Sequence, residues 1–346
     1  MTARRTTEAE DVVWLRSGSA LPSAARREGT ELARRVGLDE ERIAGLRIAL
    51  TEAATNLQRH AGDGALALRV VRFGDRPAVE CLALDSGPGI ADPGRALADG
   101  VSSAGTLGIG LGAIARLADS FDLYTRQGQG TALLAHFTVG DAPEPGAPGG
   151  PETAVVAGLT RPISGEQLCG DTWAAHEDAE GVTVMMCDGL GHGPLAARAA
   201  EQARAAFRGT ALTRPEDLLR HLHSALKGTR GAAVAVARVD LATRRVALCG
   251  AGNIAGFVLT GTERFPLLSM PGIVGHQVRT LRTFEADLPT GALLILHSDG
   301  LRDRWAPADF PALPRHRPAV VAGHLLWQTG VRRDDAGIVV VKVPPA

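Results

Sequence analysis

The sequence is poor in aromatic residues, in charge of one sign and in long apolar runs. Only 4% of its 346 residues are Phe, Trp or Tyr, and the formal net charge is -1. Few stacking side chains and no excess of positive charge count against binding to single-stranded nucleic acid or to an anionic membrane surface. The longest apolar runs, such as residues 291–296, are far shorter than the roughly 20 residues of a membrane-spanning helix. We therefore expect no nucleic-acid partner and no membrane partner.

Cysteine is also scarce. None of the four cysteines, Cys81, Cys169, Cys187 and Cys249, is paired at CxxC spacing, and each lies in or beside an apolar run. This pattern favours reduced core thiols over disulfides or a zinc site. The first residues lack the apolar segment of a signal peptide, so we expect a cytoplasmic location.

One segment differs sharply from the rest in composition. Residues 140–152 read "GDAPEPGAPGGPE", a density of Pro and Gly that neither a helix nor a central strand tolerates. We therefore expect a first domain at residues 1–139, a linker at 140–153 and a second domain at 154–346. Both domains alternate between helical and strand-like patterns, which predicts a mixed α/β (α+β) protein.

A long amphipathic helix is expected at residues 39–60. Asp39 is a plausible N-cap, and one apolar stripe follows at Ile43, Leu46, Leu50, Ala53 and Leu57. In "TEAATNLQRH", Glu52 and Asn56 stand four residues apart and therefore share one face of the helix. An asparagine oxygen suits Mg²⁺ beside phosphates, and a glutamate can accept a proton from an incoming hydroxyl.

Glycine-rich motifs follow this helix. In "LDSGPGI" an aspartate ends an apolar strand, "GTLGIGLGAIARL" leads into a helix, and "GQGT" precedes the last strand of this half. A glycine-rich turn that opens a helix offers bare amides and a positive dipole end to phosphates, and a strand-end aspartate can bind an exocyclic amine. The candidate nucleotide-binding residues are Asn56, Asp85, Gly87, Gly89, Gly108, Gly110, Gly112 and Thr131.

Each of these motifs is common by chance when taken alone. A lone GxGxG resembles a dinucleotide fingerprint, but the first strand–turn–helix unit of this chain carries no such glycines. The motifs in this order, within one compact stretch, are more specific and predict a nucleotide-binding site with Mg²⁺.

Four acidic motifs mark the second half. Asp171 lies in "LCGDTW", Asp188 in "MMCDGLGHG", Asp299 in "LHSDGLRD" and Asp334 in "VRRDDAGIVVV". Each Asp-Gly alone is typical of a turn, but carboxylates without a Cys or His set indicate hard divalent ions such as Mg²⁺ or Mn²⁺. Two such ions would neutralise the acids and activate a water for attack on phosphorus, and the Gly189 carbonyl could also reach a metal.

Residues 20–139 resemble the GHKL (Bergerat-fold) ATP-binding domain, and in particular the short anti-sigma-factor serine kinases. The resemblance implies a two-layer α/β sandwich in which Asn56 holds Mg²⁺, Asp85 contacts adenine and Glu52 is the base toward a serine hydroxyl. It also implies that Gly108, Gly110 and Gly112 line the phosphates. The phosphoacceptor helix pair of sensor histidine kinases is missing, which favours transfer to a separate protein.

Residues 154–346 resemble the PPM-type metal-dependent serine/threonine phosphatases, most closely the bacterial SpoIIE-like subgroup. The resemblance implies a four-layer α/β/β/α sandwich in which Asp171 and Asp188 bridge two metals together with the Gly189 carbonyl. Asp299 and Asp334 would hold the second ion, with Asp335 left open as an alternative to Asp334. The chain departs from the pattern at Gly337, where the family usually has Thr or Ser, and Arg161 is the candidate for phosphate contact.

Taken together, the two resemblances imply a bifunctional regulator of a bacterial partner-switching pathway. One site would phosphorylate a serine of a STAS-domain antagonist or stress-scaffold protein, and the other would remove the phosphate; a sigma-factor regulator is a further partner that the resemblances imply. Two alternatives stay open. The first domain could be a regulatory module that binds only ATP and a partner, or the second could hydrolyse phosphodiesters or small phosphate esters.

Overall fold

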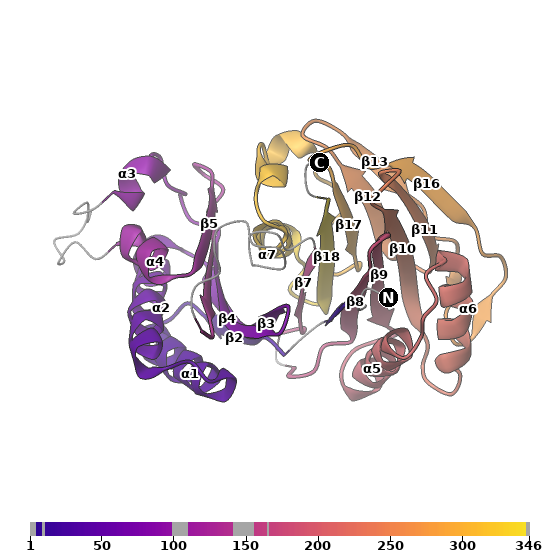
Figure 1. Ribbon diagram of the computed structural model, residues 1–346, viewed down its shortest axis with the longest axis horizontal. Helices are drawn as coiled ribbons and strands as arrows, with labels where there is room; N and C mark the ends of the chain where they lie inside the picture. The colour runs from indigo at the N-terminus through magenta and orange to yellow at the C-terminus, as the bar shows by residue number, and fades with distance from the viewer. Residues whose placement is uncertain (1–4, 9–10, 99–109, 141–155, 165, 344–346) are drawn as a thin grey trace. The chain divides into compact units, whose positions relative to one another are not determined.

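The computed structural model describes residues 5–8, 11–98, 110–140, 156–164 and 166–343. It divides into two compact units, an N-terminal unit of Glu10–Ala154 and a C-terminal unit of Met1–Ala9 with Val155–Ala346. Each unit is a layered α/β structure, so the expected fold class is confirmed (Figure 1). In the described part of the chain, no helix has the length and apolar character needed to cross a bilayer.

The N-terminal unit is one antiparallel sheet with helices stacked on one of its faces (Figure 1). The strand order is β2-β3-β4-β6-β5. The strands are β2 (Val13–Arg16), β3 (Gly64–Phe73), β4 (Arg76–Asp85), β5 (Ser120–Thr125) and β6 (Thr131–Thr138). The helices are α1 (Leu21–Val36), α2 (Glu40–His60), α3 (Pro93–Leu97) and α4 (Leu111–Leu117).

Helix α2 fixes the geometry of this unit. The Asp39 carboxylate accepts a hydrogen bond of 2.8 Å from the Arg42 amide, which confirms the expected N-cap. The predicted stripe is buried against α1 and the sheet, together with Ala49 and Ala54. Because this apolar stripe holds one side of α2 on the sheet, Glu52 and Asn56 remain only half-buried on the rest of its surface.

The C-terminal unit has two sheets packed face to face, with helices outside each (Figure 1). The first sheet has the order β1-β8-β9-β10-β11-β16, and the second has the order β13-β12-β17-β18-β7. Helices α5 (Pro194–Arg208) and α6 (Pro215–Ala225) pack on the first sheet, and α7 (Pro318–Thr329) packs on the second. This arrangement confirms the expected four-layer α/β/β/α sandwich.

The strands of the first sheet are β1 (Arg5–Glu8), β8 (Asp171–Glu177), β9 (Gly181–Gly189), β10 (Ala232–Asp240), β11 (Arg245–Ala251) and β16 (Thr283–Asp287). Those of the second are β7 (Val156–Arg161), β12 (Ala255–Leu259), β13 (Arg264–Leu267), β17 (Leu293–His297) and β18 (Ala336–Lys342). A small hairpin is formed by β14 (Gly272–Ile273) and β15 (Gln277–Val278), and two short 3-10 helices occur at Pro307–Asp309 and Leu313–Arg315.

Strand β9 shows why the first sheet is apolar on both faces. Val184 and Met186 enter the core between the two sheets, whereas Met185 and Cys187 enter the core under α5 and α6. Side chains alternate along a strand, so a strand covered on both sides reads as a continuous apolar run. All four cysteines are free thiols; Cys81, Cys187 and Cys249 are core residues as expected, whereas Cys169 is only partly buried.

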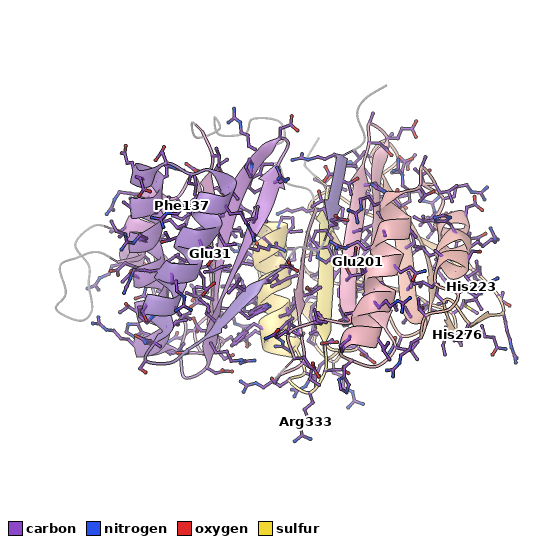
Figure 2. The ribbon with its side chains drawn as sticks, turned by 90° about the horizontal axis from the view of Figure 1, so that it is seen from below. Glu31, Phe137, Glu201, His223, His276 and Arg333 are labelled. Carbon is purple, nitrogen blue, oxygen red and sulfur yellow. The ribbon has the colours of Figure 1, made fainter. Side chains whose placement is uncertain are left out.

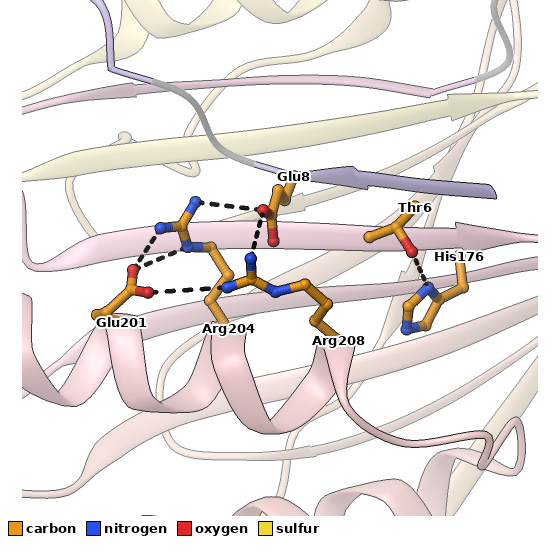
Figure 3. A network of polar contacts seen from close by, with 6 residues as sticks. All are labelled: Thr6, Glu8, His176, Glu201, Arg204 and Arg208. Carbon is orange, nitrogen blue, oxygen red and sulfur yellow. Dashed lines mark hydrogen bonds and ion pairs between the residues drawn. The ribbon is translucent and has the colours of Figure 1, made fainter. Parts of the chain in front are cut away.

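The first strand of the chain belongs to the C-terminal unit. Strand β1 pairs antiparallel with β8, so that Thr6 faces His176. The His176 Nε2 lies 2.9 Å from the Phe207 carbonyl, which can only accept, so Nε2 carries the proton. The other nitrogen, Nδ1, then accepts a hydrogen bond of 2.9 Å from the Thr6 hydroxyl (Figure 3).

A charged cluster ties the end of β1 to α5. The Glu8 carboxylate lies 3.7 Å from the Arg204 guanidinium and 3.4 Å from that of Arg208. Glu201, one turn back on the same helix (Figure 2), pairs with both arginines (Figure 3). Glu8 and Arg204 are half-buried and Glu201 and Arg208 are exposed, and the two arginines balance the charge of the two glutamates.

The pairing of β1 differs from the expected domain boundaries, which placed residues 1–139 in one domain. A four-residue strand has too little periodicity to reveal a partner some 170 residues away, because pairing depends on non-local packing. The N-terminal unit is therefore inserted between β1 and β7. The expected linker at 140–153 lies, apart from Gly140, outside the described residues.

We expect Thr6→Val to lower the free energy of unfolding of the C-terminal unit by about 1 kcal/mol, because His176 Nδ1 loses its donor. The change is measured by urea denaturation followed by tryptophan fluorescence. Thr7→Val, on the opposite side of the same strand, is the control and should leave the transition in place. Equal shifts in the two variants would show that the hydroxyl of Thr6 contributes nothing specific.

Candidate functional site

Asp85 is the last residue of β4 in the N-terminal unit. Its carboxylate accepts a hydrogen bond of 2.7 Å from the Gly87 amide. Burial raises the pKa of Asp85, and hydrogen bonds from Gly87 and Thr131 oppose this shift. The structure thus brings three of the expected nucleotide-binding residues into direct contact.

Two positions near Asp85 require glycine because other backbone segments approach them closely. Gly89 has φ +69°, and a Cβ there would lie 2.1 Å from the Arg126 carbonyl oxygen. Gly130 has φ +78°, and a Cβ there would lie 1.9 Å from the Asp85 carbonyl oxygen. Only glycine fits such positions. The loops after β4 and before β6 therefore pack directly on each other, and a 2.7 Å hydrogen bond from Gly128 to Pro88 joins them.

The end of α2 lies against the loop that follows β4. A Cβ at Gly87 would lie 2.7 Å from the His60 carbonyl oxygen, and Asn56 and Glu52 lie one and two turns before His60 on the helix. Burial raises the pKa of Glu52, and the nearby Arg59 opposes the shift. A carboxyl with a raised pKa is a stronger proton acceptor, as a general base requires.

The glycine-rich segment before α4 is described only in part. Gly108 lies outside the described residues. Gly110 precedes the first turn of α4, and a Cβ at Gly112 would lie 2.5 Å from the Leu97 carbonyl oxygen, so α4 packs closely against the end of α3. The phosphate-binding role of all three glycines stays a prediction.

The acidic motifs of the C-terminal unit meet where strands of its two sheets end. Asp171 on β8 and Asp188 on β9 are direct cross-strand partners. The Ser298 hydroxyl, just after β17, donates a 2.5 Å hydrogen bond to Asp171 across the two sheets. It also accepts a hydrogen bond of 3.0 Å from the Gly337 amide on β18. Asp299 and Asp334 lie beside these strand ends.

Mutual repulsion marks the four carboxylates as one electrostatic group. The pKa of Asp188 is raised to about 7 by burial first and then by the charges of Asp299 and Asp334. Burial and the charge of Asp188 raise the pKa of Asp171. Burial and the charge of Asp334 raise that of Asp299. Uncompensated negative charge of this kind is relieved when a cation binds.

Among the residues that the structure describes, no three carboxylates, histidines or cysteines close into a ready metal cage. The donors are nonetheless all oxygens, and the repulsion between them leaves an excess of negative charge at the strand ends. Mg²⁺ and Mn²⁺ prefer such donors, so the site fits hard divalent ions. Gly189 belongs to the same edge, since its amide donates a 2.9 Å hydrogen bond to the Gly170 carbonyl.

The geometry separates the two neighbouring aspartates at the start of β18. Asp335 is buried, and its two oxygens accept hydrogen bonds of 2.7 Å each from the Ile163 and Gly170 amides. Asp334 is exposed, with only the Asp335 amide as a recorded donor, at 3.0 Å. Asp334 is therefore better placed to bind an ion, and Asp335 anchors the loop before β8.

Two polar residues of this site had no role from the sequence. Asn253, in the motif "GAGN", donates a 2.6 Å hydrogen bond to the Asp299 carboxylate. Ser298, in "HSDG", orients Asp171. At Gly337 a Cβ would lie 2.3 Å from Met186 Cε and 3.0 Å from Asp171 Cβ, so the Ser298 hydroxyl supplies the polar contact to Asp171 where a bulkier residue at 337 would collide.

Arg161, the candidate for phosphate contact, and His192, in the loop after Asp188, have other contacts. Arg161 is buried and donates a 2.8 Å hydrogen bond to the Val331 carbonyl, so it supports the loop that carries Asp334. This contact argues against the expected role of Arg161 in binding phosphate. His192 is exposed, with its Nδ1 3.6 Å from the Glu166 carboxylate.

Comparisons with known proteins agree that the two halves of the chain are different domains. The model of the histidine kinase-like ATPase domain matches residues 19–137, and the model of stage II sporulation protein E (SpoIIE) matches residues 178–344. The serine/threonine-protein kinase RsbT of Bacillus subtilis (strain 168) is 35% identical over 112 residues, which cover 32% of this chain and 84% of RsbT. The chain belongs to the RsbT-like ATPase family. A SpoIIE-type PP2C phosphatase domain is fused C-terminal to the ATPase domain.

The SpoIIE-type domain has its own relatives. The phosphoserine phosphatase RsbX of Bacillus subtilis (strain 168) is 27% identical over 139 residues, or 40% of this chain and 69% of RsbX. A solved structure described as "The bacterial stressosome: a modular system that has been adapted to control secondary messenger signaling" is 30% identical, with a TM-score of 0.50. The similarity covers 54% of this chain and 98% of the chain in the solved structure. Both domains are thus related to stressosome partner-switching regulators.

The repulsion in the SpoIIE-type domain has a measurable consequence for the metal-free protein. The folded pKa of Asp188, about 7, lies above its ordinary 3.8, so the folded state keeps a proton that the unfolded chain has lost. Between these two pKa values the stability of the folded state falls as the pH rises, and the loss is complete above about pH 7. In the presence of a chelator, we expect Asp188→Asn to raise the Tm at pH 8 and to reduce the difference in Tm between pH 6 and pH 8.

Asp178→Asn is the matched control with the opposite sign. Hydrogen bonds from Arg238 lower the pKa of Asp178 to about 2, so its charged form stabilises the fold at both pH values. This variant should lower the Tm. A decrease in both variants would show that the four carboxylates do not repel one another in the folded protein.

Proposed function

We propose that the chain is a two-way regulator of a bacterial partner-switching pathway. The RsbT-like domain uses ATP to phosphorylate a serine on a STAS-domain scaffold or antagonist protein, and the SpoIIE-type domain hydrolyses the phosphoserine. The kinase name of one relative and the phosphoserine phosphatase name of another support this pairing. A cytoplasmic location is part of the same proposal.

The kinase half of the proposal depends on α2 and the loops around Asp85. Asp85 would accept a hydrogen bond from the adenine amine, and Asn56 would hold Mg²⁺, which neutralises phosphate charge when it is bound. Glu52 would accept the proton of the serine hydroxyl, and its raised pKa supports this role. The glycines of these loops would allow the backbone to approach the nucleotide closely.

The phosphatase half depends on the paired Asp171 and Asp188, and this pair is the observation that carries the proposal. With Asp299, Asp334 and the Gly189 carbonyl, these residues would hold Mg²⁺ or Mn²⁺. When bound, such ions supply an activated water for attack on phosphorus. Ser298 and Asn253 would orient Asp171 and Asp299, as residues behind metal ligands commonly do.

We expect Glu52→Gln to reduce phosphate transfer from ATP to a STAS-domain protein at least about 100-fold, because the base is lost while the shape is kept. Wild-type transfer should fall as the pH is lowered through a pKa above the ordinary 4.5 of glutamate, and the residual rate of the variant should not. Transfer is followed with radiolabelled ATP, and ATP binding is checked by calorimetry.

Glu41→Gln, in the first turn of the same helix, is the control and should transfer phosphate normally. A wild-type protein that binds ATP and changes its phosphatase rate, but transfers no phosphate, would contradict the kinase assignment. In that case the RsbT-like domain would be a regulatory module.

We expect Asp171→Asn and Asp188→Asn to lose Mn²⁺-dependent phosphoserine hydrolysis by at least about 100-fold, because each removes a charge that would bind the ions. Both variants should retain phosphate transfer from ATP. Asp240→Asn, at the far end of β10, is the control. Faster hydrolysis of bis-p-nitrophenyl phosphate than of a phosphoserine protein would instead indicate a phosphodiesterase.

A further inference from the structure

Exposed leucines gather on the loops around the SpoIIE-type site. Of the seven large hydrophobic side chains that are exposed in the described residues, three are Leu168 (49%), Leu190 (38%) and Leu195 (50%). All three adjoin the loops of the first sheet that carry Asp171 and Asp188. Scattered exposed leucines are normal, but a group of them around one site indicates an interaction surface.

Backbone contacts hold these three leucine-bearing segments together. The Gly189 amide donates to the Gly170 carbonyl, which joins the segment after Leu168 to the segment before Leu190. A Cβ at Gly170 would lie 2.9 Å from Ala196 Cβ, and one at Gly189 would lie 2.4 Å from the Ala196 carbonyl oxygen. The segment that bears Leu195 is therefore packed on the other two.

The loops of the second sheet carry arginines at the same site. Arg302 and Arg304 follow Asp299, and Arg333 directly precedes Asp334. All three are exposed, and within the described ranges none of their side chains has a recorded hydrogen bond or ion pair. Figure 2 shows Arg333 extending outward from its loop.

These two loops are also joined by their backbones. Leu301 forms a bridge with Gly330, and the Arg302 amide donates a 2.9 Å hydrogen bond to the Thr329 carbonyl. The Val331 amide donates one of 2.7 Å to the Gly300 carbonyl. The arginines are therefore presented on one connected pair of loops beside Asp299 and Asp334.

We propose that these two sets of side chains form a bipartite docking surface for the phosphoprotein substrate. Leu168, Leu190 and Leu195 contact apolar side chains beside the phosphoserine, and Arg302, Arg304 and Arg333 contact acidic side chains of the same protein near it. The inference rests on the proposed phosphatase function and names the surface chemistry of its substrate. A phosphate ester has to reach the carboxylate group between these loops, so a protein that delivers it necessarily meets both sets.

The test compares the hydrolysis of two substrates in the presence of Mn²⁺. One is a serine-phosphorylated STAS-domain protein. The other is p-nitrophenyl phosphate, which is too small to reach the leucines and arginines of the proposed docking surface. The double variant Leu168→Ser/Leu195→Ser should raise KM for the phosphoprotein by about tenfold and leave p-nitrophenyl phosphate hydrolysis within twofold. Leu190 is left unchanged because it adjoins Gly189. Leu212→Ser, an exposed leucine (37%) between α5 and α6, is the matched control and should change neither rate.

The arginine side is tested through salt. Attraction between exposed charges is screened by ions, whereas apolar contact is not. Arg302→Ala/Arg333→Ala should therefore lower kcat/KM for the phosphoprotein about tenfold at low salt, with a smaller effect at 0.5 M NaCl. The leucine variant should show the same fold-change at both salt concentrations.

Several outcomes would overturn the inference. Equal losses on both substrates would assign the side chains to the site itself. A KM for the phosphoprotein that stays within twofold of the wild type, or a leucine variant that changes only the oligomeric state, would assign the leucines to another role or to self-association. A wild-type protein that hydrolyses neither substrate would contradict the proposed phosphatase function, and the docking inference with it.

Discussion

The C-terminal unit depends on the repulsion between carboxylates gathered at the strand ends of its two sheets. Asp171 and Asp188 face each other in the first sheet, and Asp299 and Asp334 adjoin the ends of the second. Such a group is stable without ions only when protons replace part of the negative charge. Much of the surrounding polar structure, from the Ser298 hydroxyl to the Asn253 amide, keeps these oxygens in fixed positions despite their repulsion.

The N-terminal unit uses a different means to prepare a site. The loops after β4 and before β6 pack so closely that Gly89 and Gly130 tolerate no side chain. In the proposed function, one half of the chain would bind phosphate beside these glycine-rich loops, and the other would bind it through metal ions held by acids.

The sequence predicted those features that depend on local periodicity. The apolar stripe of α2 follows from the helical period, its Asp39 cap from the residue type, and the buried strands of the second half from continuous apolar runs. Contacts between distant segments could not be found in this way. The hydrogen bond between Ser298 and Asp171 spans 127 residues, and the apolar run of β17, which is buried on both faces, does not indicate which carboxylate lies opposite its end. The choice between Asp334 and Asp335 likewise required the two amides that Asp335 binds.

The placement of β1 also affects the order in which the chain can fold during synthesis. Strand β8 leaves the ribosome some 165 residues after Glu8, so the first strand has no partner while the whole ATPase-like unit is being made. Nascent chains grow by about 5–20 residues per second, which leaves that segment unpaired for roughly ten seconds or more. The polar residues of β1, among them Thr6 and Glu8, keep the unpaired segment hydrated and so disfavour its aggregation.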